Sequence, residues 1–329
     1  MPQVLITGGA GFIGSHVADH LLAAGYRVRV FDNGALQVHG PLEGPPAYLS
    51  PAVEYVRGDV CDGPALERAL HGVDAVVHLA AMVGVGQSMY EVERYTAVND
   101  LGTAVLMQAL LERPVGRLVV ASSMSVYGEG RYLSAAGAVH DGVERNPERI
   151  RVGDWEPTDG AGGRLRPIAT PEDKTPSLRS VYALNKYVQE RMSLLIGEAY
   201  GIPTIALRLF NVYGTRQALS NPYTGVLAIF AARLLNGNRP RVFEDGAQRR
   251  DFVHVSDVAR AVRLALEAPP EVSGVFNIGS GESRTIRDVA RQLAATMGRP
   301  ELAPEITGRY RTGDVRHCFA DIARGANPS

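Results

Sequence analysis

Tyr182 and Lys186 are the residues best suited to acid–base chemistry in this 329-residue sequence. The segment 181–200 is predicted to be a helix, so the two side chains share one face, a turn apart. A phenol has a pKa of about 10 and ionises near neutrality only beside positive charge, which a lysine can supply. The pair could then exchange a proton with a substrate hydroxyl. The same spacing also occurs on ordinary surface helices, so the interpretation depends on what surrounds the pair.

Two serines are predicted to reach the same region. Ser122 and Ser123 directly follow the apolar run 118–121, which is typical of a buried strand. Strand-like runs alternate with helical patterns along this part of the chain, which indicates parallel strands joined by helices. Ligands bind at the carboxyl edge of such sheets, where both serines would lie.

A glycine-rich loop joins the first predicted strand, 4–7, to a helix over 12–24. Gly8, Gly11 and Gly14 lack side chains, so the backbone can approach a pyrophosphate and place it at the helix N-terminus. Glycine patterns alone often mark turns, but this one has the strand–loop–helix context of a dinucleotide site.

An acid in the expected place strengthens that interpretation. Asp32 follows the second strand, 28–31, about 20 residues beyond the loop. Its carboxylate would accept a hydrogen bond from a ribose 2′-hydroxyl and repel a 2′-phosphate, which favours NAD over NADP. Asp59 and Val60 follow the third strand and could meet the adenine, although Asp59 could equally cap a helix.

The composition limits the classes of function. With 45% hydrophobic and 21% charged residues the chain is a folded globular protein, and its net charge of −1 argues against nucleic-acid or anionic-membrane partners. Cys61 and Cys318 are the only cysteines, which favours a reducing compartment and excludes a Cys-based metal site. No apolar run suits a membrane span. We therefore expect a soluble cytoplasmic protein without a metal.

The order of elements predicts an α/β fold: a doubly wound parallel sheet with a smaller C-terminal α/β domain. We assign 1–211 to the first domain and 212–329 to the second, with short segments returning to the first sheet. The stretch 129–178 shows little periodicity and is too long for an ordinary connection. It is either a functional flap or an inserted subdomain, and we predict that it covers the sugar side of the cleft.

The sequence resembles the extended short-chain dehydrogenase/reductases, the nucleotide-sugar epimerases and dehydratases, over nearly its whole length. The motifs that carry the resemblance are the glycine loop, Asp32, Leu79-Ala80-Ala81, Asn99, 122–128, Tyr182 with Lys186, 208–211, 250–254 and 311–314. The resemblance implies a Rossmann fold that binds NAD, with Tyr182 as the base, Ser123 bonded to the reacting oxygen and Lys186 on the nicotinamide ribose. The implied cofactor residues are Gly8, Gly11, Phe12, Ile13, Gly14, Asp32, Asn33, Asp59, Val60, Leu79, Ala80, Ala81, Asn99, Ser122, Tyr182 and Lys186.

The resemblance also implies how a nucleotide-diphosphate sugar would be held. Asn211, Arg250 and Arg311 would bind the phosphates and Asp314 the nucleotide ribose, while Ser88 and Ser123 would meet the sugar. Val242 and Phe243 could wall the base and Cys318 could set the pocket size, or all three could belong to the core. His78 and His254 are interpreted as core histidines. The helices 92–112 and 181–200 resemble those that form a homodimer interface in the family.

Residues after Ser123 bear on the reaction. Dehydratases of the family carry Asp-Glu there, whereas this sequence has Met124 and Ser125, which cannot eliminate water. The expected activity is therefore inversion at C4 through a 4-keto sugar. The segments 32–40, 220–225 and 313–321 resemble those of bacterial epimerases that act on dTDP-L-rhamnose. UDP-hexose or UDP-uronate epimerisation, 4-keto-sugar reduction and a non-catalytic cofactor sensor remain alternatives.

Overall fold

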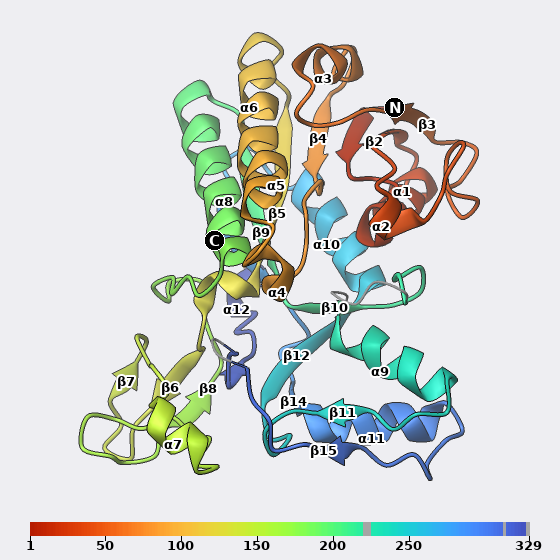
Figure 1. The fold of residues 1–329 in the computed structure, drawn as a ribbon. Helices are drawn as coiled ribbons and strands as arrows, with labels where there is room; N and C mark the ends of the chain where they lie inside the picture. The colour runs from red at the N-terminus through yellow and green to blue at the C-terminus, as the bar shows by residue number, and fades with distance from the viewer. Residues whose placement is uncertain (220–224, 312–313, 327–329) are drawn as a thin grey trace.

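The computed structural model describes residues 1–219, 225–311 and 314–326 (Figure 1). A seven-stranded sheet forms its larger part, with the strand order β13-β9-β5-β4-β1-β2-β3 and every pairing parallel. The chain starts in the middle of the sheet at β1 and winds outward in both directions, so the carboxyl ends of all its strands lie on one edge. Its strands are β1 Gln3–Thr7, β2 Arg27–Asp32, β3 Glu54–Arg57, β4 Ala75–His78, β5 Arg117–Ser123, β9 Thr204–Leu209 and β13 Gly274–Ile278.

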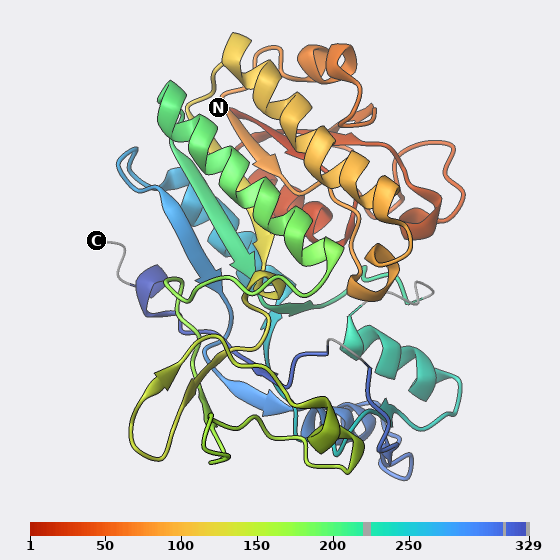
Figure 2. The same cartoon turned by 60° about the vertical axis from the view of Figure 1, so that its left-hand side comes forward.

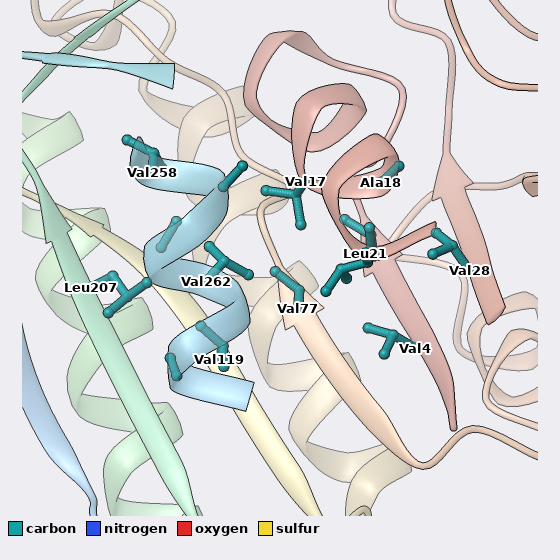
Figure 3. Packing of buried hydrophobic residues seen from close by; sticks show 14 of the residues in the cluster. Val4, Val17, Ala18, Leu21, Val28, Val77, Val119, Leu207, Val258 and Val262 are labelled. Carbon is teal, nitrogen blue, oxygen red and sulfur yellow. The ribbon is translucent and has the colours of Figure 1, made fainter. Parts of the chain in front are cut away.

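Helices cover both faces of this sheet because its strands are apolar on both sides. On one face, Val17 and Leu21 of α1 and Val258 and Val262 of α10 pack over apolar side chains such as Val77 (Figure 3). On the other face, α3 and α6 pack over alternate residues of the same strands. The covering helices are α1 Phe12–Ala23, α3 Gly63–Ala69, α5 Val92–Thr96, α6 Gly102–Glu112, α8 Val181–Tyr200 and α10 Val255–Glu267.

Two smaller units lie side by side below the carboxyl edge of the sheet (Figures 1 and 2). The insertion contains β6 Arg131–Leu133, β7 Val139–His140, α7 Pro147–Arg151 and β8 Arg166–Ile168, with β6 between its two partners. The C-terminal domain contains β10 Asn211–Tyr213, α9 Val226–Leu235, β11 Arg241–Val242, β12 Arg249–His254, β14 Ser283–Thr285, α11 Ile286–Thr296, β15 Glu305–Ile306 and β16 His317–Cys318. Short helices complete the chain: α2 Leu36–His39, α4 Val85–Ser88, η2 Met124–Tyr127 and α12 Ala323–Ala326.

The predicted fold class is confirmed, and the structure refines the elements. The helix expected over 92–112 is continuous but contains a π-helical segment, η1 Ala97–Leu101, between α5 and α6. After residue 211, β13 pairs with β9 in the large sheet and α10 packs on α1, where short segments of unspecified position were expected to return. Pairing partners cannot be identified from local periodicity. The predicted motif at 220–224 and the residues Thr312 and Gly313 lie outside the described residues.

None of the helices in the described ranges combines the length and the apolarity that a membrane span requires.

Candidate active site

A cavity of about 640 Å³ opens at the carboxyl edge of the large sheet. It extends from the glycine loop across β1 and β4 to the end of β5 and the start of α8. Most of the predicted cofactor residues line it: Gly8, Gly11, Phe12, Ile13, Gly14, Asp32, Asn33, Asp59, Val60, Leu79, Ala80, Ala81, Ser122, Tyr182 and Lys186. The sequence motifs, which are up to 178 residues apart, therefore converge on one site.

The glycine loop is built without room for side chains. Gly8 has a φ of +67°, and a Cβ there would lie 2.8 Å from the backbone of Ala80. A Cβ on Gly14 would lie 2.4 Å from the carbonyl oxygen of Gly8, so this glycine lets α1 approach the loop closely. The free N–H groups at the start of α1 thus face the cavity, as a bound pyrophosphate requires.

Three polar side chains, Asp32, Asn33 and Asp59, lie at the end of the cavity where β2 and β3 end. The Asp32 carboxylate accepts hydrogen bonds from the backbone N–H groups of Ala10 at 3.0 Å and Gly34 at 2.9 Å. Asn33 donates to Asp59 at 3.0 Å. Burial alone would raise the pKa of Asp59, but the hydrogen bonds from Cys61 and Asn33 hold it below its ordinary value. Both acids can therefore accept hydrogen bonds from a ligand.

Tyr182, Ser123 and Lys186 lie at the other end of the cavity, where β5 ends and α8 begins. The Tyr182 side chain is buried, which raises the pKa of its phenol to about 12, and the hydrogen bond with Ser123 opposes this shift. The Lys186 ammonium donates to the Ala121 carbonyl at 2.7 Å and to Gln189 Oε1 at 2.9 Å. Burial lowers its pKa to about 7. Lys186 was expected to lower the pKa of Tyr182, but burial has the largest effect on the pKa of both groups.

Ser88 and Asn99 do not line the cavity, but each binds the backbone of a residue that does. Ser88 was expected to meet the sugar, but its hydroxyl donates to the Val85 carbonyl at 2.7 Å and accepts from the Tyr182 N–H at 3.0 Å. Asn99, in the π-helical segment, bonds to both the N–H and the carbonyl of Met82. The Ser122 hydroxyl likewise donates to Glu190 at 2.6 Å. Ser88 and Asn99 thus position backbone, and Ser122 is bonded to a buried carboxylate.

On the substrate side, Asn211 and Arg311 occupy different surroundings. Asn211 lines the cavity, and its buried Oδ1 has no partner within the described residues. Arg311 is largely exposed, lies 4.4 Å over the Phe243 ring and pairs with Asp314 at 3.3 Å. Arg311, Phe243 and Asp314 thus form one cluster on the C-terminal domain, outside the cavity.

Several predicted substrate residues are engaged elsewhere. Arg250 donates to the carbonyls of Val315 and Arg316, so the guanidinium secures that segment instead of facing the cavity. Val242 is fully buried in a cluster with Phe230, and Cys318 is 1% exposed, so the core interpretation holds for both. Burial raises the pKa of the Cys318 thiol to about 12.

The two histidines differ from each other. His78 is a core histidine as expected, buried between Thr7 and Thr103. His254 was wrongly predicted to be buried: it is exposed and caps α10 by accepting from the Ser256 N–H. The strand pattern of 249–254 does not indicate that its last residue also caps the following helix.

The insertion packs against the C-terminal domain and contributes no residue among the described ones that line the cavity. Arg145 donates to Glu244 at 2.6 Å, and the fully buried Arg316 binds Glu156, Glu244 and Asp245. The segment is therefore an inserted subdomain with its own strands and helix, and Arg145 also donates to the carbonyl of Asp314 in the predicted nucleotide-binding cluster.

Other residues at the adenosine end were missed from the sequence. His39 Nε2 lies 3.5 Å from Asp32 Oδ1, and Tyr48 donates to the Ala10 carbonyl at 2.7 Å. Arg216 comes from the other side of the fold and lies 5.5 Å over the Tyr48 ring. All three line the cavity. Tyr48 and Arg216 come from loops with no periodic pattern, and His39 ends the short helix α2, where its position soon after Asp32 was the one hint of its place.

Comparison with known proteins agrees with this geometry. The sequence matches the NAD dependent epimerase/dehydratase family over residues 4–144 and 158–279. It is 37% identical to a dTDP-L-rhamnose 4-epimerase of Burkholderia thailandensis over 98% of this chain and 88% of the relative. The structure is similar to that of a UDP-glucose 4-epimerase of Thermotoga maritima with UDP-glucose, with a TM-score of 0.78 at 31% identity, covering 98% and 91% of the two chains. It is also similar to a UDP-glucose 4-epimerase of Thermus thermophilus in complex with NAD, with a TM-score of 0.77 at 32% identity, covering 97% and 90%.

Proposed function

The chain belongs to the NAD dependent epimerase/dehydratase family, and we propose that it is an NAD-dependent nucleotide-sugar 4-epimerase. The proposed reaction inverts C4 through a transient 4-keto sugar. The proposed substrate is a dTDP-6-deoxyhexose such as dTDP-L-rhamnose. The observation that carries the proposal is that Ser123, Tyr182 and Lys186 share one cavity with the glycine loop and Asp32.

The residues present fit NAD. The Gly8 and Gly14 positions form a cradle that a Cβ would fill, and Asp32 stands where a ribose 2′-hydroxyl would be bound. Lys186 uses two of its three N–H donors on protein acceptors, which leaves one for the nicotinamide ribose. NAD, when bound, supplies the hydride chemistry at C4 of the sugar.

The protein's own residues would move the proton. Tyr182 Oη would take the proton of the sugar 4-hydroxyl and later return it to the same oxygen when the hydride comes back to the opposite face of C4, while Ser123 bonds to that oxygen. Burial raises the pKa of this phenol to about 12, so the phenolate needs nearby positive charge, which the Lys186 ammonium and a bound NAD⁺ would together provide. Removing water from the closed site strengthens both interactions.

The arrangement of acids favours epimerisation over dehydration. Among the described residues that line the cavity, the carboxylates are Asp32, which ends β2, and Asp59, which follows β3. Ser123 ends β5, three strands away from β2, or about 14 Å at the usual strand spacing. Met124 and Ser125 stand where dehydratases of the family carry Asp-Glu. Among the described residues that line the cavity, no carboxylate therefore lies beside Tyr182 to eliminate water.

A UDP-hexose or UDP-uronate is the alternative substrate class, and a 4-keto-sugar reductase is the alternative activity. UDP-glucose epimerases are among the similar structures, and one similar structure is a UDP-glucuronic acid 4-epimerase bound to UDP-glucuronic acid and NAD. The 37% identity to the dTDP-L-rhamnose enzyme supports the deoxysugar. The exposed cluster contains Arg311 for a phosphate, Phe243 for a base and Asp314 for a ribose. These are the parts of a nucleotide that the three residues were predicted to bind.

We further propose that the protein is a cytoplasmic homodimer. Apolar side chains on α8 and on the continuous helix from α5 to α6 are half exposed, with Leu101 at 54%, Leu184 at 46% and Leu195 at 54%. Burying them against a second copy would remove this apolar surface from water. The free thiols of Cys61 and Cys318 support a reducing compartment.

The test is turnover on a substrate panel without added cofactor. Purified protein is incubated with dTDP-L-rhamnose, UDP-glucose and UDP-glucuronic acid, and the products are separated by ion-exchange chromatography. The proposal expects the C4 epimer from at least one substrate, fastest from the dTDP sugar, and no product from a Tyr182→Phe variant that still binds NAD. No product from these three sugars, together with oxidation of added NADH or NADPH in the presence of a dTDP-4-keto-6-deoxyhexose, would instead support the reductase.

A further inference from the structure

The Lys186 ammonium is held by an unusual side chain for a buried cation. Lys186 is 4% exposed, and its partners within the described residues are the Ala121 carbonyl and Gln189 Oε1. Gln189 lies three residues further along α8 and is 1% exposed. A neutral amide therefore provides half of the acceptors that keep this charge in place.

The orientation of the Gln189 amide follows from the chemistry of its neighbours. An ammonium only donates hydrogen bonds, so the Oε1 atom must face Lys186 and the Nε2 atom must point away. On that side Nε2 donates to Thr103 Oγ1 at 2.8 Å and lies 3.3 Å from His78 Nε2. Thr103 can accept because its own hydroxyl proton goes to the Asn99 carbonyl at 2.6 Å.

His78 completes the arrangement from the large sheet. Its Nδ1 lies 2.7 Å from Thr7 Oγ1, at the end of β1 and beside the glycine loop. A ring hydrogen on His78 Nε2 would oppose the N–H of the Gln189 amide, so the assigned network has a neutral ring with its hydrogen on Nδ1, which donates to Thr7 Oγ1. Burial, with the nearby Lys186 charge, lowers the pKa of His78 to about 3 and keeps it neutral. The chain of contacts thus runs from Lys186 through Gln189 to β1, β4 and α6.

We propose that Gln189 is a positioning residue for Lys186, and that it directs the remaining ammonium N–H toward the cofactor ribose because Thr103 and His78 lock its amide in one orientation. The proposal rests on the cofactor-binding role of Lys186 under the proposed function. It goes beyond that function because it assigns the orientation of the lysine to a residue that touches neither substrate nor cofactor.

Other charged groups near Lys186 are already compensated. Glu190, the next residue on α8, pairs with Arg208 at 2.6 Å and accepts from Ser122. Burial raises the pKa of the Tyr182 phenol to about 12, so this group carries no charge near neutral pH. His78 is neutral. Gln189 is thus the side chain whose replacement should change the Lys186 charge most directly.

The sequence permits a direct test, because Lys174 and Lys186 are its only two lysines. Lysine labelled with carbon-13 at Cε gives two NMR signals, and a Lys174→Arg variant assigns them. The pKa of Lys186 is read from its titration in the ligand-free protein. Gln189→Met should lower this pKa by about one unit, since a hydrogen bond to the charged form is lost. Gln189→Glu should raise it, because a carboxylate favours the ammonium.

A second readout is the affinity of cofactor-free protein for NAD⁺, measured by calorimetry. Gln189→Met should weaken it roughly tenfold, and Thr103→Val, which frees the amide without touching Lys186, should weaken it in the same direction. Ser193→Ala is the matched control: Ser193 is buried one turn along α8, and its hydroxyl has no partner within the described residues. It should change neither readout.

An unchanged Lys186 titration in Gln189→Met, or an equal effect of Ser193→Ala, would overturn the inference. Neither readout uses a sugar, so failure of the proposed function appears separately, as a wild-type protein that turns over no nucleotide sugar. In an active wild type, Gln189→Met should lower kcat roughly tenfold while KM for the sugar stays within about twofold.

Discussion

The Ser88 hydroxyl accepts a hydrogen bond from the backbone N–H of Tyr182 at 3.0 Å, across 94 residues of sequence. Ser88 also donates to the Val85 carbonyl, so it ties the short helix α4 to the first turn of α8. The first N–H groups of a helix lack partners within the helix, and a side chain that caps them also fixes where the helix begins. The position of the proposed base is thus set by a residue outside the cavity.

Ser88→Ala should therefore reduce activity as well as stability. It leaves the buried Tyr182 N–H without an acceptor, which we expect to cost about 1–2 kcal/mol in urea unfolding. Ser180→Ala is the matched control, because Ser180 caps the same helix by accepting from the Ala183 N–H at 3.1 Å. Both variants should lose similar stability, but kcat should fall further in Ser88→Ala. Equal kcat values in the two variants would contradict a positioning role.

Replacing Asp32 tests the cofactor end of the cavity. Asp32→Asn keeps the size of the side chain but replaces one acceptor oxygen with a donor, which opposes the N–H groups of Ala10 and Gly34 and a ribose hydroxyl. Affinity for NAD⁺ should fall roughly 10- to 100-fold in calorimetry. Circular dichroism should confirm that the variant is folded. Unchanged affinity in a folded variant would argue against the assigned site.

Glu156 should make docking of the insertion sensitive to acid. Burial would raise the pKa of Glu156, but hydrogen bonds from His317 and Arg316 outweigh it and lower the pKa from 4.5 to about 2. The unfolded chain therefore takes up this proton first, and the stabilisation present above pH 4.5 is lost as the pH falls toward 2.

Glu156→Gln should cost about 1–3 kcal/mol at pH 7 and flatten the loss of stability between pH 4.5 and 2. The measurement is urea unfolding at several pH values. Asp154→Asn, which breaks ion pairs within the insertion at Arg149 and Arg164, is the control and should cost less than about 1 kcal/mol. Parallel pH curves for wild type and Glu156→Gln would refute the assignment.

The lowered pKa of Lys186 predicts how the stability of the protein changes with pH above neutrality. Burial lowers its pKa from 10.5 to about 7, so the unfolded chain binds more protons than the folded one between these values. This group alone should make the ligand-free protein more stable as the pH rises from about 7 to 10.5. Lys186→Met should lack this rise. A difference between wild type and variant that stays constant with pH would contradict a depressed pKa.

The doubly wound sheet was predictable because apolar runs and glycine loops are local signals. The cofactor end was predictable for the same reason: Gly8, Gly14 and Asp32 have fixed spacings imposed by the backbone. By contrast, Arg250 was assigned to a ligand although its guanidinium binds carbonyls of the segment after residue 314. Such contacts depend on which segments the fold brings together, and no local pattern encodes them.

The role of the insertion shows the same limit. Its length and composition set it apart, but Arg145 and Glu156 find their partners 99 and 160 residues away. No local pattern indicated that charge pairs attach it to the C-terminal domain. Gln189 was missed for a related reason, since a single glutamine on a helix gives no signal until His78 and Thr103 surround it.

The most direct test of the account is a proton NMR time course of the purified protein with dTDP-L-rhamnose in D₂O and no added cofactor. The account predicts loss of the starting H4 signal and growth of the C4 epimer, with hydrogen, not deuterium, retained at every ring carbon. That result requires the hydride to leave and return within one bound complex. Deuterium at C3 or C5 would contradict the account, because it would show inversion through an enol instead.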